Sequence, residues 1–345
     1  MHPAKFLGWL ALLALPGSLA AGSSNGLSFQ TSDRILEFTR PGPRPVATET
    51  AVWVDTARQR PVPLKLYYPA GDEPPLPVIV YSHGLGGSRE GCAYLGHFWA
   101  SHGFLSVHPQ HHGSDEQVWR GKLRPRAAIK ASFDDPQNLV DRVADLRFVL
   151  DSLESHAARQ TPLGRRIDNS RIGIAGHAFG ALAALVTAGQ SPPQLPYHSA
   201  PDARVKAVLA LSSPVSVGWP DHAAEYAAIR VPVLHMTGTD DDSPVGPTRA
   251  ADRRVPYDSI HGADQILVTF FGADHLTFSG HLRRRASQAD PYYQRRIEAA
   301  STAFWTAYLK DVSPLAEWLG EGGMAEIIGP AGWVEARSAG ALARW

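Results

Sequence analysis

Short apolar runs alternate with longer segments of helical periodicity along most of this chain. Eight runs are rich in apolar, β-branched or aromatic residues and predict strands at 51–56, 64–68, 78–82, 105–108, 171–175, 205–211, 231–236 and 265–271. The first two runs alternate between polar and apolar residues, which is typical of an antiparallel edge. The later runs are continuously apolar, which favours parallel strands that are buried on both faces.

Three segments between or after these strands predict helices. The clearest begins at Pro136, with Asp135 as its N-cap. Its apolar side chains recur every three or four positions and form one stripe, made up of Leu139, Val143, Leu146, Leu150 and Leu153. The other two helices are predicted at 179–188 and 293–309, whereas the basic segment 120–130 is interpreted as a solvated loop. Strands that alternate with helices indicate an α/β domain with a mainly parallel sheet.

The length and composition of the chain suit one large α/β domain. It has 345 residues, of which 44% are hydrophobic and 19% are charged, so a sizeable core is available. Lysine plus arginine and aspartate plus glutamate number 33 each, so no overall charge attracts nucleic acid, and none is expected as a partner. The single cysteine, Cys92, excludes an internal disulfide.

The N-terminal segment has the pattern of an export signal. Lys5 is followed by an apolar run at 6–15 and by small residues that continue to Ala21. We therefore predict a signal peptide at 1–21, a tether at 22–47 and a single domain at 48–345 that includes the C-terminal tail. An uncleaved membrane anchor is the alternative, but the apolar run is short for a membrane span. The mature protein is expected to be secreted or periplasmic, without stable insertion in a membrane.

Four turns with candidate chemistry directly follow predicted strands. They are the segments 83–87 (HGLGG), 176–180 (GHAFG), 237–242 (TGTDDD) and 272–275 (GADH). The second turn joins a buried strand to an alanine-rich helix, and its two glycines suit a strained turn that packs tightly against neighbouring backbone. Each turn lies at the carboxyl end of its strand, where open α/β sheets carry their binding sites.

In this order, the four turns resemble those of the α/β-hydrolase superfamily. Within it, the chain is similar to bacterial platelet-activating-factor acetylhydrolase-like and dienelactone-hydrolase-like esterases, from about Val52 to Leu309. The resemblance implies an α/β-hydrolase fold, with a mostly parallel eight-stranded sheet flanked by helices. It also implies hydrolysis of a carboxylic ester of a small molecule, lipid or polymer through an acyl-enzyme, without a cofactor.

The resemblance assigns a role to each turn. Ala178 occupies the position where the family carries its serine nucleophile, and His275 corresponds to the general base. The acid is Asp241 by the common G-x-x-D spacing from Gly238, or Asp242 if the turn is one residue longer.

The backbone N–H groups of Leu85 and Phe179 correspond to the oxyanion donors of the family. His83, Gly84 and His177, which lie in the same two turns, are expected to contact the substrate.

Alanine at position 178 has two interpretations. In the first, the chain is an esterase of the Ser-His-Asp type whose serine has been replaced, by engineering or by a recent substitution, so that it is inactive as written. In the second, it is a natural non-catalytic relative that binds an ester-like or lipid ligand. The retained acid, histidine and HGLGG turn favour the first, because a long-decayed relative would be under no pressure to keep them. Ser82 and Ser114 are not predicted as nucleophiles, because neither lies on such a turn.

Two further segments have other candidate roles. The histidine-rich segment 108–115 could suggest a metal site, but Asp115 is its only carboxylate, so no metal is predicted. The C-terminal tail at 313–345, which contains Trp318, Trp333 and Trp345, is expected to pack on its own domain. Nothing in the sequence indicates an oligomeric state.

Overall fold

The computed structural model describes residues 35–71, 74–195, 200–280 and 290–339. The predicted signal peptide at 1–21 and the first part of the predicted tether lie outside the described residues. Among the residues that are described, no helix combines the length and the apolar character needed to cross a bilayer.

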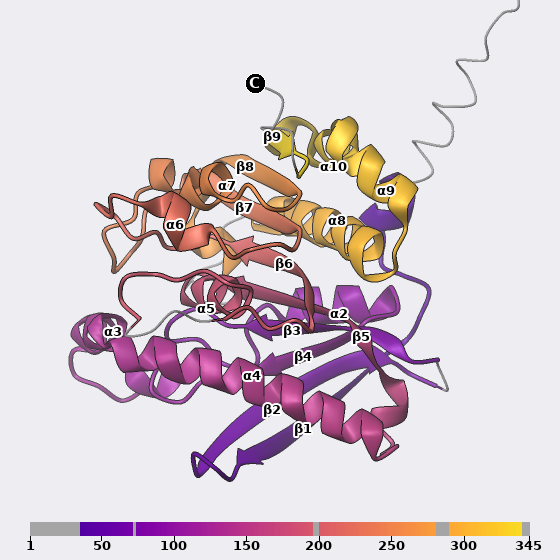
Figure 1. The fold of residues 1–345 in the computed structure, drawn as a ribbon, viewed down its shortest axis with the longest axis horizontal. Helices are drawn as coiled ribbons and strands as arrows, with labels where there is room; N and C mark the ends of the chain where they lie inside the picture. The colour runs from indigo at the N-terminus through magenta and orange to yellow at the C-terminus, as the bar shows by residue number, and fades with distance from the viewer. Residues whose placement is uncertain (1–34, 72–73, 196–199, 281–289, 340–345) are drawn as a thin grey trace, which may run out of the picture.

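Nine strands of the described chain form one sheet in the order β1-β2-β4-β3-β5-β6-β7-β8-β9 (Figure 1). The strands are β1 (Val46–Asp55), β2 (Arg60–Pro69), β3 (Leu76–Ser82), β4 (Leu105–Pro109), β5 (Ile167–His177), β6 (Val205–Leu211), β7 (Val233–Asp240), β8 (Gln265–Asp274) and β9 (Gly332–Arg337). Strands β3 to β8 run parallel to one another, whereas β2 and β9 run antiparallel to their neighbours. The sheet is therefore mostly parallel, as the sequence predicts.

Each of the eight predicted strands overlaps one strand of the sheet, but the sheet has a ninth within the described residues. Strand β9 pairs with β8, from Gln265 opposite Arg337 to Phe270 opposite Gly332. Its side chains are half-buried or exposed, so its sequence lacks the continuous apolar run that marks the inner strands. This pairing places the C-terminal segment on the edge of the domain.

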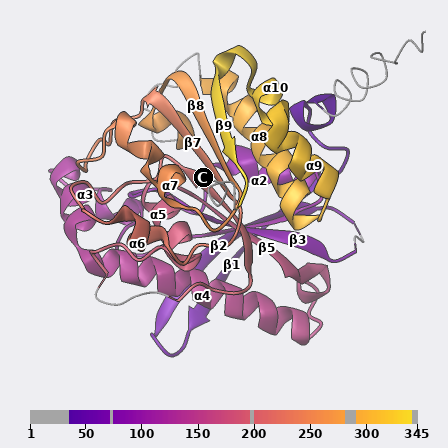
Figure 2. The ribbon, with the colours of Figure 1, turned by 45° about the horizontal axis from the view of Figure 1, so that its top comes forward.

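Helices cover both faces of the sheet (Figure 2). One face carries α3 (Pro125–Asp134), α4 (Pro136–Ala158), α5 (Phe179–Thr187), α6 (His222–Tyr226) and α7 (Val255–Ser259), and the other carries α2 (Ala93–Ser101), α8 (Asp290–Leu309), α9 (Ser313–Trp318) and α10 (Met324–Ile328). Short helical turns are η1 (Glu116–Val118), η2 (Gly164–Arg166), η3 (Ala250–Arg254), η4 (His275–Phe278), η5 (Leu319–Gly323) and η6 (Gly329–Ala331). A separate hydrophobic cluster fills the space between the sheet and each helical layer.

Helix α4 has the predicted start and the predicted buried stripe. The Asp135 side chain accepts a hydrogen bond from the backbone N–H of Gln137 at 2.9 Å, which caps the helix. All five apolar residues of the stripe are buried against the sheet. The preceding basic segment differs from its prediction, because α3 starts at Pro125 instead of continuing as a loop. A proline at the first helical position favours this start, and the lysine and arginine side chains remain solvated on the helix surface.

The described part of the predicted tether packs on the domain. Phe38 is 2% exposed and joins the cluster that contains α2 and α8. The backbone N–H of Gly42 donates to Ser101 Oγ at 2.8 Å, and β1 already begins at Val46. The prediction of a tether is therefore wrong for residues 35–47, because a single buried phenylalanine gives no periodic signal in the sequence.

Candidate active site

The turn between β5 and α5 holds Ala178 in a strained conformation. Its backbone angles are φ 50° and ψ −118°, a region that residues with a Cβ rarely adopt and that costs about 1–3 kcal/mol. The flanking glycines allow the turn to pack against other backbone. A Cβ on Gly176 would lie 2.3 Å from the carbonyl carbon of Gly180, and one on Gly180 would lie 2.0 Å from the carbonyl oxygen of Ser82. The surrounding chain therefore fixes the turn, as the two glycines predict.

His275 and Asp241 form a hydrogen-bonded pair after β8 and β7. The distance from His275 Nδ1 to Asp241 Oδ1 is 2.8 Å. Two hydroxyl groups, those of Ser212 and Thr237, donate to the other carboxylate oxygen at 2.6 and 2.8 Å. Burial alone would raise the pKa of Asp241, but the hydrogen bond from His275 and the charge of Arg253 outweigh it and lower the pKa. Asp241 is therefore an anion that orients the His275 ring.

The structure distinguishes the two aspartates that the sequence left open. Asp242 is exposed, and its carboxylate binds Arg249 and the backbone N–H of Ala250 rather than a histidine. The meeting of Asp241 with His275 depends on a close approach of the two turns. A Cβ on Gly238 would lie 2.0 Å from the carbonyl oxygen of Ala273, so only glycine fits there.

Two backbone N–H groups near Ala178 have no protein acceptor among the described residues. In the 83–87 turn, the N–H of Gly86 donates to Ser114 and that of Gly87 donates to Gly84, whereas the N–H of Leu85 makes no such bond within the described residues. Phe179 is the first residue of α5, so its N–H has no partner within the helix. Both groups are available to an acceptor on a ligand.

The histidines beside these groups are neutral. His83 Nε2 accepts from the backbone N–H of His111 at 3.1 Å, so Nδ1 carries the proton and donates to the Gly84 carbonyl at 2.7 Å. His177 Nε2 lies 3.1 Å from the carbonyl oxygen of His275, and the two rings are 4.8 Å apart. Burial lowers the pKa of His83 far below its usual value and that of His177 to about 3.

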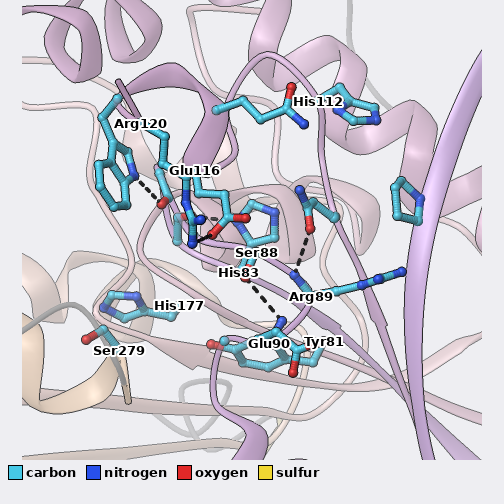
Figure 3. A pocket seen from close by; sticks show the side chains of 18 residues that line it. Tyr81, His83, Ser88, Arg89, Glu90, His112, Glu116, Arg120, His177 and Ser279 are labelled. Atoms are coloured by element: carbon cyan, nitrogen blue, oxygen red, sulfur yellow. Dashed lines mark hydrogen bonds and ion pairs between the residues drawn. The ribbon is translucent and has the colours of Figure 1, made fainter. Parts of the chain in front are cut away.

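A cavity of about 580 Å³ opens beside the 83–87 turn (Figure 3). His83, Gly84 and His177 line it. The opposite wall comes from the segment after β4 and includes Glu116, Trp119 and Arg120. Ala178 and His275 do not line this cavity, which instead reaches the turn between β5 and α5 through Gly84 and His177.

A second histidine–aspartate pair lies behind the 83–87 turn. Asp145 Oδ2 is 3.0 Å from His111 Nδ1, and His111 Nε2 is 3.0 Å from Ser82 Oγ. All three residues are buried, and Arg142 on α4 packs beside them. Sequence reasoning missed Arg142 and Asp145. The available signal is that both are charged residues, three positions apart, within the apolar stripe of α4.

The other histidines of the 108–115 segment have separate partners. His108 contacts Ser106 and the carbonyl of Gly91, whereas His112 faces Asp115 at 3.3 Å. Among the described residues, no three histidine, cysteine, aspartate or glutamate side chains are grouped as metal ligands.

The sequence comparison agrees with this architecture. Residues 43–120 match the family model of platelet-activating factor acetylhydrolase, isoform II. The match runs from just before β1 through the 83–87 turn to Arg120, and it does not include Ala178, Asp241 or His275. No curated protein matches the chain. The protein has the α/β-hydrolase fold, the scaffold of many ester-hydrolysing enzymes. Within that superfamily it resembles the platelet-activating-factor acetylhydrolases.

Proposed function

We propose that this scaffold belongs to a carboxylic ester hydrolase whose nucleophile position holds alanine, so that the chain as written does not turn over esters. The observation that carries the proposal is the strained conformation of Ala178, with φ 50°, on the turn between β5 and α5. An alanine has no need of this conformation, whereas a serine there would be presented at the end of the sheet. The ordered His275–Asp241 pair supports the same assignment.

The proposed reaction with serine at this position follows from the arrangement. The hydroxyl oxygen attacks the ester carbonyl while His275 takes the hydroxyl proton, and Asp241 stabilises the resulting imidazolium. The N–H groups of Leu85 and Phe179 stabilise the negative charge on the carbonyl oxygen. The proton then passes to the leaving alcohol, and an acyl-enzyme forms. Water, deprotonated by His275, releases the carboxylic acid. With Ala178 no acyl-enzyme forms, because no hydroxyl is present.

The test is restoration of the hydroxyl by Ala178→Ser. We expect kcat for p-nitrophenyl acetate to rise by at least about 10³-fold over the chain as written. An organophosphonate should label the Ala178→Ser variant and leave the alanine form unlabelled, as mass spectrometry can establish. The control is Ala178→Ser combined with His275→Gln, which should lose most of the gain. Robust hydrolysis by the alanine form would instead mean that another nucleophile carries the reaction.

The alternative is a binding protein for an ester-like or lipid ligand. The alanine itself, next to a cavity of about 580 Å³, is the observation that favours it. In that case Ala178→Ser would fold and yet neither hydrolyse short esters nor react with the phosphonate. Calorimetric titration of the chain as written with an uncleaved ester would then report binding.

We also propose that the protein is exported and acts on an ester outside the cytoplasm. The residues that support this are Lys5, the apolar run at 6–15 and the small residues that reach Ala21. The mature protein from its host should begin near Ala21 or Gly22. N-terminal sequencing of exported protein measures this directly, and an intact Met1 would contradict it.

A further inference from the structure

Arg142 is a fully buried arginine that contacts the 83–87 turn. Its Nη1 donates to the carbonyl of His83 at 2.5 Å, and its Nη2 lies 3.4 Å from the carbonyl of Gly84. The other edge of the guanidinium holds the segment after β4, with Nε donating to Ser114 Oγ at 2.8 Å and Nη2 donating to the Ser114 carbonyl at 3.1 Å. Ser114 in turn accepts from the N–H of Gly86, so one side chain connects the turn to its support.

The same guanidinium also contacts Phe179, the residue that follows Ala178. Its central carbon lies 4.8 Å from the centre of the Phe179 ring, within range of a cation–π interaction. Phe179 supplies one of the two unpartnered N–H groups, and Leu85 in the 83–87 turn supplies the other. Arg142 therefore touches both segments that carry these groups.

The geometry of the peptide unit explains what these contacts do. In a trans peptide, the C=O of one residue and the N–H of the next point in opposite directions. The carbonyl of Gly84 and the N–H of Leu85 belong to one such unit. Three donors hold this carbonyl toward the α4 side: Gly87 N–H at 3.0 Å, His83 Nδ1 at 2.7 Å and Arg142 at 3.4 Å. The Leu85 N–H is thereby directed away from Arg142.

The charge of Arg142 is not neutralised by a direct ion pair within the described residues. Asp145, one turn further along α4, binds Arg58, Arg60 and His111 instead. Burial lowers the pKa of Arg142 to about 9, so the side chain is still a cation at neutral pH. A buried positive charge in a site of low dielectric acts strongly on nearby negative charge.

We propose that Arg142 is a positioning residue for the oxyanion site, which holds the 83–87 turn against Phe179 and adds a positive charge behind the Leu85 and Phe179 N–H groups. This inference rests on the proposed ester hydrolysis at position 178. An arginine that only stabilised the fold would affect the binding of every ligand equally. In the proposed role, Arg142 strengthens the binding of an anionic tetrahedral species more than that of the neutral ester.

The first test uses binding by the chain as written, which needs no catalysis. A stable phosphonate monoester anion mimics the tetrahedral species, and a neutral carboxylic ester mimics the substrate. Arg142→Met should weaken binding of the phosphonate by about 10-fold or more while the affinity for the neutral ester changes little. Equal losses for both ligands, or no loss for either in a folded variant, would overturn the proposal.

The second test uses the Ala178→Ser variant as the active reference. Adding Arg142→Met should lower kcat by about 10–10²-fold with KM nearly unchanged. The matched control is Arg60→Met, because Arg60 is a half-buried arginine of the same region that binds Asp145 and the carbonyl of His112 and does not contact the 83–87 turn. It should lower stability and leave kcat unchanged. A fall in kcat that is equal in both variants would assign Arg142 a structural role only.

Arg142→Lys provides a test that survives if the methionine variant does not fold. Burial lowers the pKa of a lysine from a lower starting value than that of an arginine, so the charge behind the turn is lost at a lower pH in this variant. In the Ala178→Ser background, the decline of kcat toward higher pH should therefore begin at a lower pH with lysine than with arginine at position 142. A pH profile identical to that of the arginine form, with full kcat, would refute the proposed electrostatic role. If Ala178→Ser is inactive but the phosphonate result holds, the proposed esterase function fails and the anion-binding role of Arg142 remains.

Discussion

The molecule contains two histidine–aspartate pairs of nearly equal geometry. The Nδ1-to-carboxylate distance is 2.8 Å for His275 and Asp241 and 3.0 Å for His111 and Asp145. The second pair even has a serine at the other ring nitrogen, Ser82 at 3.0 Å, which the first pair lacks. Yet the side chain of His275 is 12% exposed and that of His111 is fully buried. Hydrogen-bond geometry alone therefore does not distinguish a reactive pair from a structural one. The exposure of the histidine and a strained turn nearby are also needed.

The electrostatic surroundings of the two pairs also differ. Asp145 binds both Arg58 and Arg60, at 2.8 Å each. Burial raises the pKa of this carboxyl, but His111 and Arg60 outweigh it and lower the pKa to about 2. Burial also lowers the pKa of His111 to about 4 despite the hydrogen bond to Asp145. The charge of Asp145 is thus balanced by arginines, and the contacts of the His111–Asp145 pair connect β3, α4 and the start of β2. We interpret this cluster as structural.

The comparison is tested most strongly by removing one carboxylate charge from each pair. In the Ala178→Ser background, Asp241→Asn should lower kcat by about 10³–10⁴-fold, because the amide no longer stabilises the imidazolium or selects its tautomer. Steady-state hydrolysis of p-nitrophenyl acetate measures this. Asp145→Asn should instead lower the free energy of unfolding by about 3–5 kcal/mol and leave the kcat of the folded enzyme nearly unchanged.

The control for Asp241 is its neighbour in the same turn. Asp242→Asn removes an exposed carboxylate that binds Arg249, so kcat should change little. If Asp242→Asn is the damaging change, the assignment of the acid is wrong by one residue. If Asp145→Asn abolishes turnover without loss of stability, the buried pair takes part in the reaction.

Acid pH should reveal the buried pair through stability. In the unfolded chain the pKa of His111 is about 6.5, whereas in the folded protein burial lowers it to about 4. Stability that is present at pH 7 is therefore lost as the pH falls through this window, by at most about 3 kcal/mol for this residue. His111→Gln should make the slope of unfolding free energy against pH smaller, as urea titrations at several pH values can measure.

Ser82→Ala is the matched control for this slope. It removes the hydroxyl that contacts His111 and no titratable group, so it should lower stability at all pH values and keep the slope. The same variant should leave the activity of Ala178→Ser unchanged. An unaltered slope in His111→Gln would show that His111 does not resist protonation in the folded state.

The sequence predicts the parts of the fold whose signals are local. The continuously apolar strands and the cap of α4 at Asp135 are of this kind, and so are the glycines that flank Ala178. The turns of Asp241 and His275 could be paired in advance only through the resemblance, which assigns them the acid and the general base. The choice between Asp241 and Asp242 could not, since it depends on the direction of one turn after β7.

Features that depend on distant partners were missed. Strand β9 is identified only by its pairing with β8, and Phe38 only by the pocket that α2 and α8 provide. Arg142 lies on a stripe that predicts burial of apolar side chains, and its partners are the carbonyls of a turn about 60 residues earlier. No local pattern indicates that such a partner exists.

The smallest expected effect concerns the strain that only one of the two regions carries. Ser82 lies at the end of regular strand β3, whereas Ala178 has a positive φ. Ala178→Gly removes the Cβ that makes this conformation costly, so the free energy of unfolding should rise by about 1 kcal/mol, measured by urea titration. Ala183→Gly, in the interior of α5, is the control and should lower stability by at least about 1 kcal/mol. Equal destabilisation by both substitutions would mean that the turn at position 178 stores no strain, and the argument that its shape was built for a serine would lose its support.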